Sequence, residues 1–474
     1  MEQTIGKFRC KMKVLLINPP AFKIPRWDVP RPFYPPLGVC YLAAVLEKNN
    51  YDAKILDADI LNYGFDEILD EIKKEKPTLI GVGSVTVKYG VSIELINLIK
   101  KEFPKIKIVA GGNHVTLVKE KAFKDINLDY AIYGEAEFTL LELVQALEGN
   151  KLLKDVNGLI YKDKNRIIVN PMRVPVKDLD VIPFPARHLL KGFPRLYKND
   201  TRYKQLPMTH MVTSRGCYYR CIFCDHDRNV RYFSPKYVVD EIEHLQQKYG
   251  INEIHFWDEI FMMTPKRAKD ICEEIARRKI SITWSGYGRL SIIAKNPEVA
   301  GLMKKAGCWE LNVGIESGNQ KVLDFIKKDM TLEEIKKGCE VLRKEGIFIR
   351  GLFMLGHLID TKETIEDTVK LALELPLNSV QFNFNIPLPE TEQYGLADKY
   401  GSFADSDYEH MSGHSEEPVF IPKGLTKDYL TGIQKKAYKA FYRRPRLVLR
   451  NLKYINNIDS FKKYLTKFAR MIKG

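Results

Sequence analysis

Three cysteines, Cys217, Cys221 and Cys224, lie within eight consecutive positions in the run SRGCYYRCIFCDH. Their CxxxCxxC spacing, directly after a predicted strand, places three thiolates in one short loop. Three thiolates can hold three irons of a [4Fe–4S] cluster and leave the fourth iron without a protein ligand. The pattern therefore predicts an iron–sulfur centre with one open coordination position.

A zinc site is the competing interpretation, because His226 could join the three cysteines as a fourth ligand. Zinc sites more often use two CxxC pairs, and no second pair follows here. In a reducing cytoplasm a cysteine cluster favours a metal site over disulfides. The remaining cysteines lie singly within apparent helices or strands, which is typical of buried packing residues: Cys10, Cys40, Cys272, Cys308 and Cys339.

The elements around this loop follow an α/β pattern. Residues 12–150 alternate short β-branched runs, such as MKVLLINPP and PTLIGVGSV, with amphipathic stretches. This predicts five parallel strands in an open, doubly wound, Rossmann-like domain whose ligand binds at the carboxyl ends of the strands. The crossover helices are expected near residues 38–49, 64–75, 88–103, 114–124 and 136–148.

The rest of the chain divides into three parts. Residues 151–205 read as a connector with two short strands, GLIYKD and RIIVNP. Residues 206–390 hold six strand–helix units, which predict a parallel barrel or partial (β/α)6 barrel with its chemistry at the carboxyl ends of the strands. Residues 391–474 form a helical, basic region, with a helix expected to end before Pro445.

With Phe223 just before the third cysteine and a barrel-like series downstream, the loop resembles the signature of the radical S-adenosylmethionine (SAM) superfamily. The resemblance implies that SAM chelates the open iron through its amino and carboxylate groups. An electron from the cluster would then break the adjacent sulfonium–carbon bond and yield a 5′-deoxyadenosyl radical.

The resemblance also implies further contacts to SAM. Asp258 and Glu259 end the second barrel strand and would accept hydrogen bonds from the amino group, although such residues also cap helices. Glu316, in VGIESG, would accept from the ribose hydroxyls. Gly351 and Gly356, in GLFMLG, would support the adenine. Relatives continue with a glycine–proline turn, whereas this chain reads GHLIDTKE.

The first domain resembles the cobalamin-binding domain found upstream of many radical SAM enzymes, through NPP, PPLGVCYLAAVL, GVGSVT, GGNHVT and YGEAE. The resemblance identifies the ligand, because the sheet alone would suit a nucleotide or flavin equally well. A GxGxxG motif is missing after the first strand, which disfavours a dinucleotide. The implied cobalamin contacts are Ser84, Thr86, Gly111, Gly112, His114 and Glu135.

His114 is the only histidine before His188, and the DxHxxG motif of other cobalamin proteins is absent. We therefore expect no histidine beneath the cobalt, and expect His114 to contact the corrin periphery or cap the following helix. Methylthiotransferases are disfavoured, because they need three further N-terminal cysteines and only Cys10 and Cys40 precede the loop.

Members of this group include methyltransferases acting on unactivated carbon or phosphorus, along with ring-forming enzymes. Our leading hypothesis from the resemblance is a cobalamin-dependent methyltransferase acting on an unactivated carbon. One SAM would generate the radical and another would remethylate cobalamin. Two alternatives stay open: a radical cyclisation or coupling related to the porphyrin cyclases, and a noncatalytic cobalamin-sensing module. The sequence identifies no further catalytic residue.

The net charge of +15 is concentrated in the tail, where residues 421–474 hold 15 Lys and Arg against two Asp, a balance of +13. Such a tail could approach an anionic surface or membrane, or could simply be a solvated helix face. With no apolar run long enough to span a bilayer, we expect a cytoplasmic protein, with a peripheral position at the membrane as the alternative. Its expected partners are a small-molecule, lipid or peptide substrate and an external electron donor, and no specific nucleic acid.

Overall fold

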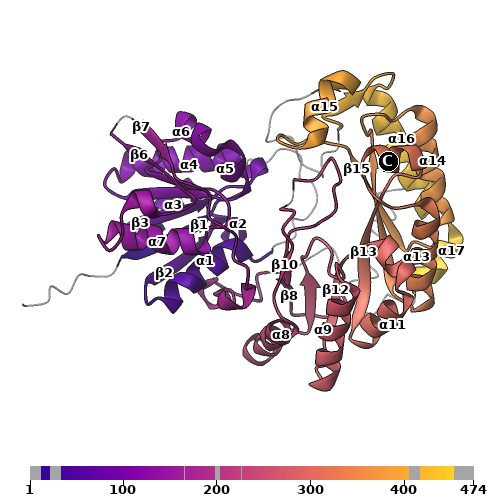
Figure 1. Ribbon diagram of the computed structural model, residues 1–474, viewed down its shortest axis with the longest axis horizontal. Coiled ribbons are helices and arrows are strands. Elements are labelled where there is room, and N and C mark those ends of the chain that lie inside the picture. The colour runs from indigo at the N-terminus through magenta and orange to yellow at the C-terminus, as the bar shows by residue number, and fades with distance from the viewer. Residues whose placement is uncertain are drawn as a thin grey trace, which may run out of the picture. The chain divides into compact units, whose positions relative to one another are not determined.

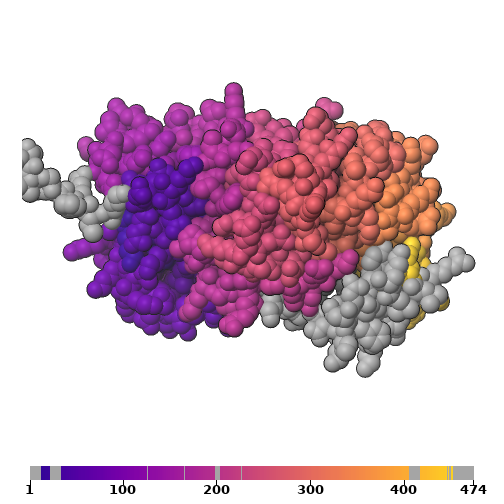
Figure 2. All heavy atoms as spheres, turned by 90° about the horizontal axis from the view of Figure 1, so that it is seen from below, coloured from indigo at the N-terminus to yellow at the C-terminus, as the bar shows by residue number. Residues whose placement is uncertain are grey.

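The structure is a computed structural model that describes residues 12–21, 34–164, 166–197, 203–225, 227–404 and 417–452; the others are grey in Figures 1 and 2. His226, Cys10 and residues 453–474 of the basic tail lie outside the described residues. The chain forms two compact units, one built mainly of residues 35–177 and one of residues 197–452, to which Tyr34 also belongs.

The first unit contains a sheet with the strand order β2-β1-β3-β4-β5-β6-β7, of which the first five strands are parallel. This confirms the predicted doubly wound arrangement. The parallel strands are β1 (Lys13–Asn18), β2 (Asp52–Asp57), β3 (Leu79–Gly83), β4 (Lys107–Gly111) and β5 (Tyr130–Ile132). The helices are α1 (Leu37–Lys48), α2 (Ala58–Leu61), α3 (Phe65–Glu75), α4 (Tyr89–Glu102), α5 (Asn113–Val118), α6 (Ala122–Asp125) and α7 (Glu137–Leu147).

The two short strands expected in a connector instead extend this sheet. β6 (Leu159–Asp163) pairs antiparallel with β5, and β7 (Arg166–Val169) pairs antiparallel with β6. Asn170 anchors the hairpin, because its buried amide donates to the carbonyls of Leu153 and Val156 at 2.7 and 2.8 Å. The first sheet is therefore mixed.

Apolar strand residues and the inner faces of the helices form the core of the first unit. In α3, Ile68, Leu69 and Ile72 are buried against the sheet while the charged positions face water. Burying apolar surface stabilises such packing by roughly 25 cal/mol per Å². This periodicity explains why the helix positions could be predicted from the sequence.

The second unit confirms the predicted partial barrel, with six parallel strands in the order β15-β14-β13-β12-β11-β8 and helices on the outer face (Figure 1). These strands are β8 (Met208–Met211), β11 (Glu253–Phe256), β12 (Thr283–Gly288), β13 (Cys308–Glu316), β14 (Phe348–Leu355) and β15 (Ser379–Phe384). The helices that follow them are α8 (Pro235–Tyr249), α9 (Pro265–Arg277), α10 (Leu290–Lys295), α11 (Pro297–Lys305), α12 (Gln320–Phe325), α13 (Leu332–Lys344) and α14 (Lys362–Glu374).

Alternate residues of the barrel strands have different surroundings. On one face, large side chains such as Phe256, Trp284 and Phe353 are fully buried beneath the helices. On the other face, Arg350 and Gln381 remain half-buried. Because side chains of a strand alternate between faces, the second set lines the barrel lumen. The lumen face therefore carries polar side chains at these two positions.

Helix α16 (Lys427–Tyr442) covers the free edge of β15. The Tyr438 hydroxyl accepts a hydrogen bond from the Phe382 amide and donates one to the Phe382 carbonyl. Gln434 donates to the same carbonyl at 2.8 Å. These side chains take the place of a neighbouring strand and protect the edge. Leu430, Ala437 and Phe441 are buried at the predicted helical spacing.

The remaining described elements are short. A second helix, α17, follows as Pro445–Leu452, and α15 (Glu392–Tyr400) precedes the small hairpin β16 (Gly401–Phe403) and β17 (Phe420–Pro422). None of the helices among the described residues is both long and apolar enough to cross a bilayer.

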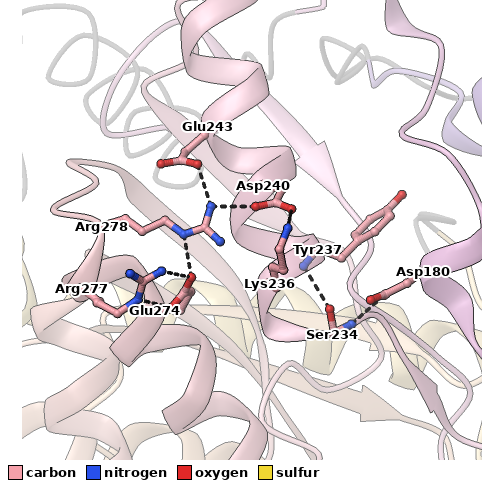
Figure 3. Close-up of polar contacts among 9 residues, drawn as sticks. All are labelled: Asp180, Ser234, Lys236, Tyr237, Asp240, Glu243, Glu274, Arg277 and Arg278. Atoms are coloured by element: carbon pink, nitrogen blue, oxygen red, sulfur yellow. Dashed lines mark hydrogen bonds and ion pairs between the residues drawn. The ribbon is translucent and has the colours of Figure 1, made fainter.

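A cluster of charged side chains joins α8 to α9 on the outside of the barrel (Figure 3). Arg278 lies at the end of α9 and contacts Asp240, Glu243 and Glu274, each at 2.6 to 2.7 Å. Its side chain is only 14% exposed, whereas the neighbouring Arg277 is 68% exposed and contacts Glu274 alone. One partly buried guanidinium thus contacts three carboxylates, of which Asp240 also pairs with Lys236 and Glu274 with Arg277.

We expect Arg278→Met to destabilise the protein by on the order of 1 kcal/mol, because the three carboxylates lose their shared cation. Thermal unfolding followed by circular dichroism at low salt should show this, and the loss should shrink at high salt. Arg277→Met is the matched control and should leave the midpoint nearly unchanged. Equal midpoints for Arg278→Met and wild type would show that the cluster contributes nothing to stability.

Candidate functional site

The three cysteines lie in one loop between the short strands β9 (Ser214–Arg215) and β10 (Arg231–Tyr232), directly after β8. Cys217 and Cys221 are buried, and Cys224 is half-buried. This position is the carboxyl end of the first barrel strand, where the sequence placed it. The loop thus holds its thiols where a parallel barrel carries its chemistry.

Backbone geometry forces the loop to begin with glycine. Gly216 has φ of +84°, and a Cβ at this position would lie 2.6 Å from the carbonyl oxygen of Asp227. The same carbonyl accepts a hydrogen bond from the Cys217 amide at 2.9 Å. The close approach of the two ends of the loop therefore depends on the absence of a side chain.

Two further backbone contacts fix the middle of the loop. Ile222 donates to the Ile326 carbonyl at 3.1 Å and accepts from the Gln393 amide at 3.0 Å. Cys224 donates its amide to the Cys221 carbonyl at 3.2 Å, which makes a tight turn between the last two thiols. The loop is therefore held by residues that follow β13 and β15, far away in the sequence.

Two buried cations lie beside the thiols. The Arg289 guanidinium stacks over the Tyr219 ring at 3.5 Å and donates to the carbonyls of Asp329 and Lys328. A hydrogen bond from Cys224 lowers the pKa of Cys221, and Lys328 and Arg289 lower it further. The two cations favour the thiolate at Cys221, while burial raises the pKa of Cys217 and the hydrogen bond to Cys221 raises the pKa of Cys224.

The donor set fits an iron–sulfur cluster better than a single ion. Among the described residues, no three Cys, His, Asp or Glu side chains meet around one ion position. His226, the fourth ligand that a zinc site would use, lies outside the described residues, whereas a cluster needs only the three thiolates, each bound to a different iron. The three thiols flanked by cations therefore suit the cluster.

The carboxylate of Asp258 supports the base of the cysteine loop. It accepts hydrogen bonds from the amides of Thr213 and Ser214, at 2.5 and 3.1 Å, and from the Thr213 hydroxyl. Burial raises the pKa of Asp258, and these donors counteract the effect. The next helix begins at Pro265 with Thr264 before it, so Asp258 does not cap a helix. Glu259 is exposed.

Glu316 occupies a strained position at the end of β13. Its φ is +66°, and its carboxylate pairs with Lys328 at 2.8 Å, with both side chains nearly buried. The Lys328 ammonium also lies 5.9 Å from the centre of the Phe223 ring. The structure thus brings the predicted residues Phe223 and Glu316 together around a lysine that the sequence did not indicate.

The turn after β14 lacks the glycine–proline pair of relatives and is held instead by hydrogen bonds to a side chain. Gly356 has φ of +84°, and its amide and that of His357 donate to Asp360 at 3.0 and 2.8 Å. Burial raises the pKa of Asp360 to about 6. Gly351 lies on the buried face of β14, where a Cβ would lie 2.7 Å from Leu377. Contact of Asp258, Glu259, Glu316, Gly351 and Gly356 with SAM stays a prediction.

In the first unit, the predicted cobalamin residues gather at the carboxyl ends of β3, β4 and β5. The Ser84 amide donates to the Gly111 carbonyl at 2.7 Å, and a Cβ on Gly112 would lie 2.5 Å from the Ser84 carbonyl. The Ser84 hydroxyl is buried without a hydrogen-bond partner among the described residues. An orphaned buried hydroxyl beside close glycine backbone is what a cradle for a bulky polar ligand would show.

His114 is fully buried beside these loops. Its ring lies 3.9 Å from that of Tyr89, and its Nδ1 lies 3.4 Å from the Thr86 hydroxyl. Burial lowers the pKa of His114 to about 4, so the imidazole is neutral at pH 7. The N-cap of α5 is Gly112, so the expected capping alternative for His114 is wrong. Glu135 accepts from the Val176 amide at 3.1 Å.

Comparison with known proteins matches these two sites to two families. Residues 28–144 match the B12 binding domain, and residues 211–372 match the radical SAM superfamily. The chain is 31% identical to an uncharacterised methyltransferase of Pyrococcus horikoshii, over 93% of this chain and 95% of that protein. It is 27% identical to the anaerobic magnesium-protoporphyrin IX monomethyl ester cyclase of Rubrivivax gelatinosus, over 86% and 74%.

Among solved structures, the chain resembles the radical SAM methyltransferase TsrM of Kitasatospora setae with cobalamin and a [4Fe–4S] cluster bound. The TM-score is 0.74 at 20% identity, covering 97% of this chain and 99% of that one. At this identity the similarity shows a common fold. Together with the matched families and the geometry of the cysteine loop, it leads to one conclusion. The chain belongs to the B12-binding radical SAM proteins, whose cofactors are a [4Fe–4S] cluster, SAM and cobalamin.

Proposed function

We propose that the protein is a methyltransferase that methylates a poorly reactive carbon. The observation that carries this proposal is the relative from Pyrococcus horikoshii, which is named a methyltransferase and aligns over nearly the full length of both chains. Such coverage includes the barrel, the first unit and the region after the barrel, so both chains share the parts that would surround a substrate.

The chemistry is divided between cofactors and protein. The bound cluster and SAM supply a carbon-centred radical, and the cobalamin supplies a transferable methyl group. The protein holds the thiolates through the Gly216 turn and positions Glu316 through Lys328. Its further task is to orient the substrate in the barrel lumen and to exclude water from the radical. An external electron donor belongs to the same proposal.

An anaerobic assay tests the proposal. The full chain, reconstituted with iron, sulfide and cobalamin, is given dithionite and SAM carrying a deuterated methyl group. Methylation predicts 5′-deoxyadenosine together with S-adenosylhomocysteine, and a labelled methyl group in the product. Omitting cobalamin should remove S-adenosylhomocysteine while 5′-deoxyadenosine persists.

The same assay distinguishes the alternatives. The similarity to a protoporphyrin ester cyclase favours a radical cyclisation as the second candidate. That reaction would give 5′-deoxyadenosine without S-adenosylhomocysteine and with no label in the product. Intact SAM after reduction would instead indicate a noncatalytic cobalamin-binding module and would contradict both enzymatic proposals.

A further inference from the structure

Five aromatic rings form a continuous wall on one side of the barrel lumen. The Tyr34 ring lies 4.2 Å from that of His210 and 4.6 Å from that of Trp257, in both cases edge to face. His255 lies 5.5 Å from His210 and 5.6 Å from Tyr287. Centroid distances of this size are those of interacting aromatic pairs. The rings therefore act as one surface.

Strand register places this wall. His255 is the direct partner of His210 on β8 and of Ser285 on β12, so these side chains share the lumen face at one level. The Ser285 hydroxyl holds the His255 Nδ1 at 2.7 Å. Tyr34 arrives from a segment that precedes the first unit's α1 but packs in the second unit. The wall thus combines three neighbouring strands, β8, β11 and β12, with a distant segment.

Much of the wall is uncharged at neutral pH. Burial lowers the pKa of His255 to about 4 and raises that of Tyr34 to about 12. Burial also raises the pKa of Tyr287. Neutral rings present flat, polarisable faces on which another ring can stack.

The wall is accessible at its rim. Trp257 follows β11 directly and is 41% exposed, while His255 and Tyr287 are half-buried. The residues on the opposite face of the same strands, Phe256 and Trp284, are completely buried. An indole left open beside four other rings is unusual for a packed core and typical of a surface that receives a ligand.

A polar surface faces the lumen from the other end of the sheet. The Arg350 guanidinium on β14 donates to the Gln381 amide oxygen, and the Gln381 amide donates to Asn383 at 2.9 Å. Arg350 lies close enough to the rings to lower the pKa of His255. The lumen thus combines an aromatic wall with a row of hydrogen-bond donors headed by a cation.

We propose that the lumen binds a planar aromatic or conjugated substrate that carries a carboxylate. Its ring stacks against Trp257 and the neighbouring rings, and its carboxylate is directed to Arg350 and Gln381. This inference rests on the proposed function, because it names the substrate class of that same site. A planar acid satisfies both surfaces at once, whereas an aliphatic chain leaves the rings open and a neutral ring leaves the polar row unused.

Binding of matched probes to the reconstituted full chain tests the proposal. Indole-3-acetate carries both features, cyclohexylacetate keeps only the carboxylate, and 3-methylindole keeps only the ring. Protoporphyrin IX serves as a larger planar acid. Anaerobic titration calorimetry should show at least one planar acid binding tenfold or more tightly than both single-feature probes.

Variants test separately which residues recognise the ring and which recognise the carboxylate. Trp257→Ala should remove the preference for the ring, with at least tenfold weaker binding of the planar acid, and Trp257→Phe should restore most of it. Arg350→Met should remove the preference for the carboxylate. Tyr429→Ala is the control. It removes a ring of α16 that lies under Lys362 of α14, and it should bind the probes as wild type does. Iron content and circular dichroism verify that each variant is folded.

Equal binding of planar and saturated acids would overturn the proposal, as would wild-type affinity in folded Trp257→Ala or no binding by any planar acid. Should Trp257→Ala lose iron, Trp257→Phe takes its place and should keep most of the ring preference of wild type. Equal affinities of the wild-type protein for the planar and the saturated acids then count against the proposal. Cleavage of SAM without any probe separates the outcomes. If wild type still forms 5′-deoxyadenosine, only the substrate class fails; if SAM stays intact, the proposed function itself fails.

Discussion

Cys221→Ser should remove the iron–sulfur cluster and reduce 5′-deoxyadenosine formation to the background rate. The Cys221 thiol is buried, hydrogen-bonded by Cys224 and close to the charges of Lys328 and Arg289. These surroundings favour a thiolate, whereas a serine hydroxyl stays protonated and is a poor ligand for iron. Iron analysis and absorbance after anaerobic reconstitution should fall from on the order of four irons per chain to a small fraction of that.

Cys272→Ala is the matched control for this substitution. Cys272 is equally buried, but it lies on α9 among packing residues and outside the loop. Its replacement should leave the iron content and the cleavage of SAM unchanged. A full cluster in Cys221→Ser would contradict the assignment of the loop. Stoichiometric zinc in wild type would contradict it too, and would revive the alternative in which the cysteines hold a single ion.

The parallel strands and the cysteine loop were predictable because their signals are local. Each barrel strand is a short run of buried residues followed by an amphipathic helix, and parallel strands joined by helices have little freedom in their order. The three thiols are contiguous in the sequence, so their spacing carries the chemistry without knowledge of the fold. Ser84 and Gly112 were named from the resemblance to the cobalamin-binding domain, and both directly follow predicted strands.

Features that depend on contacts between distant residues were not predictable. The hairpin of β6 and β7 joins the first sheet by pairing with β5, and nothing in its sequence distinguishes that pairing from an isolated hairpin. Lys328 reaches Glu316 only because the chain turns back after α12. Tyr34 joins His210 across 176 positions of sequence. Such contacts leave no periodicity, so only the folded chain shows them.

The turn that contains Asp360 departs from the family's sequence pattern. Relatives commonly continue with a glycine–proline turn, whereas this chain reads GHLIDTKE, which put adenine contacts beyond Gly356 in doubt. In the structure the Asp360 carboxylate accepts from two backbone amides and from the Thr364 hydroxyl, at 2.7 to 3.0 Å. A side-chain acceptor thus fixes the backbone after Gly356 without a proline.

Gly112→Ala should abolish stable cobalamin binding while the radical chemistry of the second unit survives. Gly112 has φ of +112°, and an added Cβ would lie 2.5 Å from the carbonyl oxygen of Ser84 and 3.2 Å from its amide nitrogen. Neither contact involves a flexible side chain, so the loops after β3 and β4 must separate. That movement would take Ser84 and His114 out of position, because the Ser84 carbonyl also accepts the His114 amide at 3.3 Å.

Absorbance of cobalamin that stays with the protein after gel filtration measures this effect, and we expect at least a tenfold loss of affinity. Gly38→Ala is the control in the same unit, since no atom lies within 4 Å of its added Cβ and the residue lies in α1, where alanine favours the helix. Because the cysteine loop belongs to the other unit, Gly112→Ala should still hold iron and cleave SAM to 5′-deoxyadenosine, but should form no S-adenosylhomocysteine.

Undiminished cobalamin binding by Gly112→Ala would show that the cofactor lies elsewhere. Loss of iron as well would mean that the two units do not fold independently, and the substitution would then no longer report on cobalamin alone.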